Sequence, residues 1–444
     1  MFSKLLEQFN SNITGLRDFV DLIQPMLDEY HKGEQEKYKN AFIPLAIAKQ
    51  IHLEEDPETK SKLQAQLDEI FDGEIEISTH IIEVDDNQED GIQNEELDNS
   101  DIEKKFAFTI KGDTSKIDDA FKFQVKSTEQ KNLLYVNSFI NLLSSAEWFY
   151  SQLLHFFYDQ NPNSAGVKKK TLTLEELKSF GNIEDAEKYL IDSKIEGLLR
   201  SSFSDWMETL KTELKLSLGY LNDFNDELVE IYQRRNLLVH NGGVINSIYL
   251  SKVHNNLVEK SEIGTKLTVD EEYLDNAINK IHVLFSLIAC ELWKKQLPED
   301  EERSNFLMEL NFGYLKRNEW SIAKLPNVFL KNDAKQPTIP RTYAQLNCWL
   351  CDKRLQFDNK LKSELDKVDY SDKTIVIQLA LASLKDEEEV FFKLLPKAID
   401  SDELLVSSFF DFPIFEEMRQ GEKYDKFKSE NLKIKSYLEE NNVA

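Results

Sequence analysis

Hydrophobic positions recur with the period of an α-helix over most of the 444-residue chain. Residues 1–72 follow this period and predict helices, the first of which places six apolar residues on one face: Phe2, Leu5, Leu6, Phe9, Ile13 and Leu16. Beyond them, GEIEISTHIIEV, KKFAFTIKG and AFKFQVKS alternate apolar and polar residues, which predicts three short strands. Residues 1–127 are therefore expected to form an N-terminal α+β region.

The helical period returns near residue 128 and predicts a long helix that ends near residue 160. Two further helices are expected at roughly 184–218 and 222–240, and the second is broken by Asn241-Gly242-Gly243, a C-cap pattern. A linker of about 25 residues is expected to follow this break.

A last helix of this block is expected to run to about Lys295. Thr268 and Glu271 have the spacing of a capping box at its start. The proline and acids of QLPEDEERS then predict a domain boundary near residue 298. The chain accordingly divides into three expected domains, 1–127, 128–298 and 299–444.

The third domain has a repetitive pattern. LNFGYLKRNEWSIA begins at Leu310, LNCWLCDKRLQFDN at Leu346 and LALASLKDEEEVFF at Leu379, so successive starts are 36 and 33 residues apart. A period in the thirties predicts tetratricopeptide-like helical hairpins that stack into a repeat domain. Such a domain offers an extended surface for a protein partner or trigger.

Composition supports a mainly α fold and limits the binding partners. Only 14 Gly and 10 Pro argue for long helices, and the net charge of -27 excludes binding of nucleic acid or anionic membranes through the overall field. RNA contact therefore requires a local basic site. Three cysteines indicate a reducing compartment, and the densest apolar stretch, VLFSLIAC, is too short to span a bilayer, so a cytoplasmic protein without membrane contact is expected.

Residues 83–103 contain ten acidic residues and no base. Such a block is typical of a solvated, mobile loop. The alternative is a mimic of the nucleic-acid backbone that occupies a basic site.

One segment, RRNLLVHNGG, carries the candidate chemistry. Arg234, Arg235, Asn236 and His240 lie at the C-terminal end of an expected helix, directly before Asn241. Asn236 and His240 are four residues apart and share a helical face. Arg235 points to a different side of the helix, so it and His240 can both contact a ligand only if that ligand lies over the helix end.

This pattern resembles the Arg-x4-6-His motif of the HEPN superfamily, which includes prokaryotic ribonucleases. The resemblance covers about 128–298 and implies a four-helix HEPN domain. It also implies a metal-independent endoribonuclease without cofactors, in which the RNA 2'-OH attacks the phosphate and leaves a 2',3'-cyclic phosphate. In the family, two protomers form one composite cleft, so a homodimer is expected, and the recurrent setting is anti-phage abortive infection or a toxin.

The resemblance assigns roles to residues of this chain. Arg235 is expected to bind and stabilise the scissile phosphate, and His240 to act as general acid or base. Asn236 is expected to orient the histidine or the phosphate.

A local basic patch supports an RNA site. Residues 231–260 carry a net charge of +3 within a chain at -27. Arg234, Asn241 and Lys252 are the candidate RNA-binding residues of this patch, and Lys168–Lys170 are a further candidate source of charge.

The alternatives are structural or non-catalytic. In the structural alternative, Arg235 pairs with a carboxylate such as Glu147 and His240 caps its helix. In the non-catalytic alternative, the chain is an inactive HEPN dimer that binds nucleic acid, nucleotide or protein. Cys348 and Cys351 are expected to be core residues rather than zinc ligands, and His282 is expected in the core. No metal site is predicted.

Overall fold

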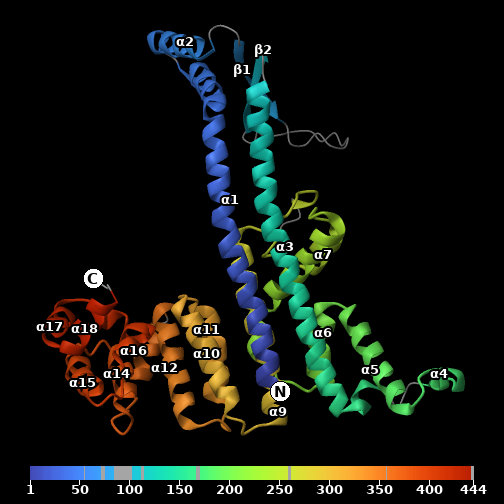
Figure 1. The fold of residues 1–444 in the computed structure, drawn as a ribbon, viewed down its shortest axis with the longest axis vertical. Coiled ribbons are helices and arrows are strands. Elements are labelled where there is room, and N and C mark those ends of the chain that lie inside the picture. The colour runs from blue at the N-terminus through green and yellow to red at the C-terminus, as the bar shows by residue number, and fades with distance from the viewer. Residues whose placement is uncertain are drawn as a thin grey trace. The chain divides into compact units, whose positions relative to one another are not determined.

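The computed structural model describes residues 1–54, 56–71, 76–84, 103–111, 115–166, 171–258, 262–356 and 358–441 (Figure 1). This part of the chain is mainly helical, which confirms the mainly α fold class. It forms two compact units, one of residues 16–138 and one of residues 1–15 with 139–444. Most of the predicted acidic loop and all of Lys168–Lys170 lie outside the described residues.

The chain begins with long helices and one hairpin. The elements of this half are α1 (Phe2–Leu53), α2 (Pro57–Phe71), β1 (Glu76–Val84), β2 (Glu103–Lys111) and α3 (Ser115–Gln160). The central elements are η1 (Pro162–Ala165), α4 (Leu174–Ser179), α5 (Ile183–Leu199), α6 (Phe203–Thr212), η3 (Gly219–Phe224), α7 (Asn225–Asn241), α8 (Ser247–Lys252) and α9 (Glu271–Gln296).

All elements of the last third are helices among its described residues. Its elements are α10 (Glu302–Lys316), α11 (Trp320–Asn332), α12 (Thr338–Arg354), α13 (Asp358–Leu365), α14 (Ile375–Leu384), α15 (Glu388–Asp400), α16 (Val406–Asp411), η5 (Pro413–Phe415), η6 (Glu417–Arg419), α17 (Glu422–Glu430) and α18 (Leu432–Glu440).

In the unit of residues 16–138, α1 and α3 run side by side (Figure 1). His31 Nε2 lies 2.9 Å from Gln130 Oε1, and Lys131 pairs with Asp28, so polar contacts join the two helices. The strands β1 and β2 pair antiparallel, with Glu76 opposite Lys111.

The third predicted strand is wrong, because AFKFQVKS belongs to α3. The alternating apolar residues of this segment are not its buried residues, because Phe121 and Val125 are exposed. The buried residues of this part of α3 are Ile117, just before the segment, and Ala120, three positions later. A helical period therefore overrides the period of two at this point.

The second unit is built around α9. Its residues from Leu274 to Trp293 are almost all buried, as expected for a helix that is apolar on all sides. The N-terminal end of α1 completes this core, where Phe2 stacks on Trp293 with ring centroids 5.5 Å apart and Phe9 stacks on Phe149 at 4.2 Å. The predicted apolar face of the first helix is thus a real core face.

The compact units differ from the three expected domains. The expected boundary at 127/128 falls within α3. The expected boundary at 298/299 lies in a tightly held segment, because Arg303 donates to the carbonyls of Leu297 and Pro298 and pairs at 3.0 Å with Asp333, both side chains being fully buried. Both sides of that segment belong to the same unit.

Helices after α9 pack on their neighbours along the chain, α10 on α11, α11 on α12, and α14 on α15. The two cysteines of α12, Cys348 and Cys351, are buried in this packing, which confirms their predicted core position. Burial raises the pKa of the Cys348 thiol to about 11. His282 on α9 is also in the core, with Nδ1 2.7 Å from the Tyr314 hydroxyl.

Two predicted helix boundaries need correction. The helix expected at 184–218 is broken between α5 and α6, where Ser202 and Asp205 form a capping box. The expected capping box of Thr268 and Glu271 does not form, since Asp270 caps α9 and accepts from the Tyr273 amide at 2.8 Å. A carboxylate one residue before the first helical turn satisfies the same free amide groups.

The turn that ends α7 generates a stability prediction. Gly243 has φ +87°, and a Cβ there would lie 2.8 Å from the Leu267 carbonyl oxygen, whereas Gly242 has φ +60° and open space around it. We expect Gly242→Ala to lower the free energy of unfolding by about 1 kcal/mol, the cost of a left-handed residue. Gly243→Ala should lower it further, because the backbone must also move. Urea denaturation of both variants measures the difference, and equal losses would contradict the close approach.

Candidate functional site

A buried polar network determines which side of α7 faces the protein interior. The carboxylate of Glu230, only 6% exposed, accepts hydrogen bonds from Arg234 Nε at 2.7 Å, Tyr249 Oη at 2.6 Å and Tyr273 Oη at 2.6 Å. Arg234 also donates to the Thr268 carbonyl and lies 3.9 Å above the Tyr273 ring. The network thereby joins α7 to α8, to the residues before α9 and to α9 itself.

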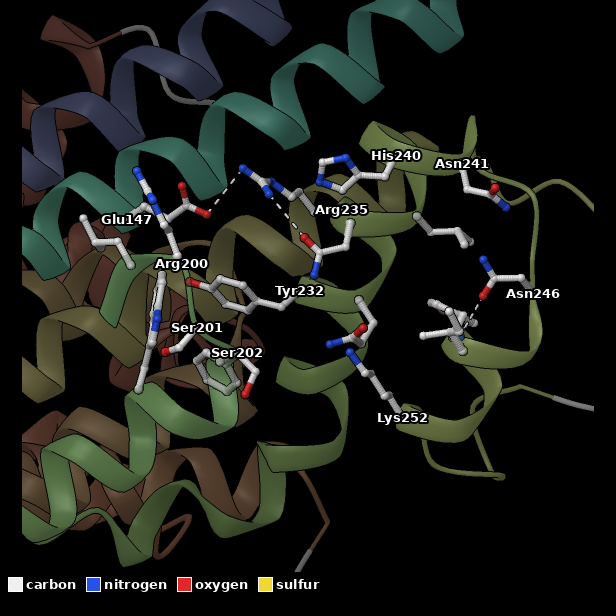
Figure 2. Close-up of a pocket in the computed structure, with 18 residues that line it drawn as sticks. Glu147, Arg200, Ser201, Ser202, Tyr232, Arg235, His240, Asn241, Asn246 and Lys252 are labelled. Carbon is white, nitrogen blue, oxygen red and sulfur yellow. Dashed lines mark hydrogen bonds and ion pairs between the residues drawn. The ribbon is translucent and has the colours of Figure 1, made fainter. Parts of the chain in front are cut away.

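Because successive residues of a helix are about 100° apart, the inward position of Arg234 turns its neighbour to another side. Arg235, Asn236, His240, Asn241 and Lys252 all line one pocket of about 620 Å³ (Figure 2). This volume is typical of a ligand-binding site. Five of the six predicted site residues are therefore brought together.

Arg234 is the sixth, and it does not line this pocket. Its side chain is 16% exposed and paired with Glu230, and it borders a second cavity of about 370 Å³. That cavity carries four carboxylates against Arg234 and Lys280, namely Glu227, Glu230, Asp270 and Glu272. The geometry gives Arg234 a structural position between α7 and α9.

Arg235 makes two polar contacts in the pocket. Its Nη1 donates to Asn236 Oδ1 at 3.2 Å, and its Nη2 lies 3.5 Å from Glu147 Oε1 on α3 (Figure 2). The carboxylate partner named from the sequence as the structural alternative is thus present. Burial raises the pKa of the Glu147 carboxyl above its ordinary value, and the positive charge of Arg235 opposes part of that rise.

His240 lies in the last turn of α7, and its side chain is exposed at the pocket. No hydrogen bond joins its ring to another residue in the described ranges. Figure 2 shows it on the same side of α7 as Arg235.

Asn241 and Lys252 are held by the turn and by α8. Asn241 Nδ2 donates to the Val244 carbonyl at 2.5 Å, which stabilises the turn after α7. Part of the expected linker forms α8, which packs on a small apolar cluster: Leu237, Ile245, Tyr249, Val253 and Val258. Lys252, in the last turn of α8, is exposed at the pocket.

Several pocket residues were missed by sequence reasoning. Arg200, Ser201 and Ser202 come from the break between α5 and α6, and Tyr232 precedes Arg235 by one helical turn. Two signals could have found them. Ser202 and Asp205 have capping-box spacing, and Tyr232, Asn236 and His240 are spaced by four.

The charge of the pocket differs in sign from that of the chain. Arg200, Arg235 and Lys252 face a single carboxylate, Glu147, among its lining residues. The chain as a whole carries -27. A cationic pocket in an acidic protein selects anionic ligands locally.

No protein-family model, curated protein or solved structure matches the chain. None of the helices among the described residues is long and apolar enough to cross a membrane.

The raised pKa of Glu147 predicts a pH-dependent effect on stability. A raised pKa means that the folded state binds more protons than the unfolded state, so this contribution is fully present below the ordinary pKa and is lost as pH rises through the raised value. The melting temperature of Glu147→Gln relative to the natural chain should therefore increase from pH 4 to pH 8, as measured by circular dichroism.

Asp205→Asn is the matched control with the opposite sign. Hydrogen bonds from Ser202 lower the pKa of the Asp205 carboxyl. Its stabilisation is fully present above the ordinary pKa and is lost as pH falls through the lowered value, so the relative melting temperature of this variant should decrease as pH rises from about 2 to 5. The same trend in both variants would contradict the assignment for Glu147.

Proposed function

We propose that this protein is a metal-independent endoribonuclease of the HEPN type. The observation that carries the proposal is the gathering of Arg235, Asn236 and His240 in one cationic pocket of an acidic chain. The motif resemblance supplies the reaction class. The structure contributes the pocket, its size and its charge.

The proposed reaction needs three chemical roles. A base removes the proton of the RNA 2'-OH, a cation stabilises the phosphorane that forms at the phosphate, and an acid protonates the leaving 5'-oxygen. His240 acts as general acid or base, a role that typically contributes about 10²- to 10⁴-fold in rate. Arg235 stabilises the phosphorane, and Asn236, which accepts from Arg235 Nη1, orients the guanidinium.

One chain supplies one histidine of this motif, whereas the reaction uses both an acid and a base. A homodimer that pairs two copies of α7 provides both, and it doubles the positive charge around the RNA. We propose this composite site together with a four-helix HEPN arrangement of the elements around α9. Its biological setting would be anti-phage abortive infection or a toxin role in the cytoplasm.

The helices α10 to α15 are proposed to form tetratricopeptide-like repeats. Their packing on sequence neighbours supports this arrangement. Their function would be to bind a protein partner or trigger that controls the nuclease.

A second function is supported by the Arg235–Glu147 ion pair. An arginine that already has a carboxylate partner is less available to a scissile phosphate. In this alternative, the chain is an inactive HEPN dimer that binds nucleic acid, nucleotide or protein.

The proposed mechanism predicts cleavage of RNA in excess EDTA. The natural chain should cut total RNA without added metal and leave 2',3'-cyclic phosphate ends, because every proposed role belongs to a protein side chain. Gel analysis and end-specific labelling measure both outcomes. Loss of cleavage in EDTA with rescue by Mg²⁺ or Mn²⁺ would refute the mechanism, and no cleavage under any condition would favour the binding function.

Substitution of the two motif side chains separates catalysis from helix capping. Arg235→Ala should lower kcat by about 10²- to 10³-fold, since it removes the cation at the phosphorane. His240→Ala should lower it by about 10²- to 10⁴-fold. Melting temperatures measured alongside should change little for His240→Ala, because that side chain is exposed and without a partner in the described ranges.

Two further variants serve as controls. Arg235→Lys keeps the charge beside Glu147 but loses the planar fork, so it should fold normally and still lose most activity. Lys252→Ala removes one charge from the same pocket and should raise KM while kcat persists. Full activity in both motif variants would show that the motif is structural.

A further inference from the structure

Two buried donors of the pocket have no hydrogen-bond acceptor. The Tyr232 hydroxyl and Arg235 Nε are both buried and make no hydrogen bond with any residue of the described ranges. Both residues line the pocket, and they are one helical turn apart on α7. Buried donors are nearly always paired in native proteins, so two unpaired donors at one pocket call for a ligand or water.

Tyr232 is held as a neutral donor. Its ring is 6% exposed, stacks on Phe203 with centroids 4.5 Å apart and meets Trp206 edge-on at 5.5 Å. Burial, with the charge of Glu147 as a second cause, raises the pKa of its hydroxyl well above the ordinary value.

The protein's own anion does not satisfy both donors. Glu147 approaches Arg235 through Nη2 alone, at 3.5 Å, and no hydrogen bond links it to Tyr232. A carboxylate has two oxygens in one plane, whereas a phosphate has oxygens that point in several directions. A phosphate can therefore accept from a guanidinium and from a phenol that approach from different sides.

We propose that the pocket holds one phosphate group of its ligand between Arg235 and the Tyr232 hydroxyl, which makes Tyr232 a phosphate-binding residue. The phosphate takes the place of Glu147 on Arg235, so the guanidinium stays paired throughout. This inference rests on the proposed function for the identity of the ligand as RNA. The phosphate chemistry itself rests on the two unpaired donors and on the positive charge of the pocket.

The test uses Tyr232→Phe in the full-length protein. Two probes are titrated, inorganic phosphate by calorimetry and a fluorescent, fully 2'-O-methylated RNA by anisotropy, which cannot be cleaved because it lacks the attacking hydroxyl. We expect roughly 10-fold weaker binding of both probes, the effect of one hydrogen bond to a charged group. The melting temperature without ligand should stay the same or rise, because the substitution removes an unpaired buried hydroxyl.

Tyr220→Phe is the matched control. Its hydroxyl is also buried and unpaired among the described residues, but Tyr220 does not line the pocket. This variant should bind both probes as the natural chain does. Weakening of RNA binding alone would place the Tyr232 contact on another group of the nucleotide and overturn the phosphate assignment.

The failures of the two proposals are distinguishable. Unchanged binding of both probes by Tyr232→Phe would show that water alone satisfies the hydroxyl, even if the natural chain cleaves RNA. Weaker binding by Tyr232→Phe together with no RNA cleavage by the natural chain would support the phosphate site and refute the nuclease. No binding of either probe by the natural chain would overturn the phosphate site.

Discussion

The positions of the pocket residues on α7 and α8 depend on one buried carboxylate. Glu230 is almost fully buried, and it accepts from one arginine and two tyrosines that belong to α7, α8 and α9. A charge in this environment is tolerated only while its hydrogen bonds are complete, so the three elements cannot rotate independently. Because the network holds Arg234 on the inner side of α7, Arg235 and His240 are left on the side of the pocket. The place of Arg235 in the pocket is thus a consequence of the buried Glu230–Arg234 ion pair.

Much of the fold follows from local patterns. The period of apolar residues predicts the helical class and the core face of Phe2 and Phe9, and it places the end of α7 at the two glycines. Local patterns give a wrong prediction where contacts between distant segments determine the structure. The segment around Phe121 alternates like a strand but continues α3, because Ile117 and Ala120 supply its buried face. The sequence predicts a separate domain for the N-terminal residues, because no local signal shows that Phe2 packs against α9, nearly 300 positions later in the chain.

The candidate site also combines features that follow from the local sequence with features that depend on packing between elements. The spacing of Asn236 and His240 on one helix is a local property, and the structure brings both to one pocket. Which of two adjacent arginines faces that pocket is not local, because it depends on Tyr249 and Tyr273 from other elements. Tyr232 could have been recognised from its spacing of four to Asn236. Its unpaired hydroxyl, in contrast, is a property of the packed state alone.

The stacking of Phe2 on Trp293 has a consequence for synthesis in the cell. Phe2 is a core residue whose partner Trp293 is translated 291 positions later. At roughly 5–20 residues per second, Phe2 waits about 15 to 60 seconds for Trp293. During that time α3 supplies Phe149 for Phe9, but the side of the apolar stripe that α9 covers stays exposed on the nascent chain, and chaperones bind surfaces of this kind. The pocket, whose α7 packs on α9, cannot reach its final form before that delay ends.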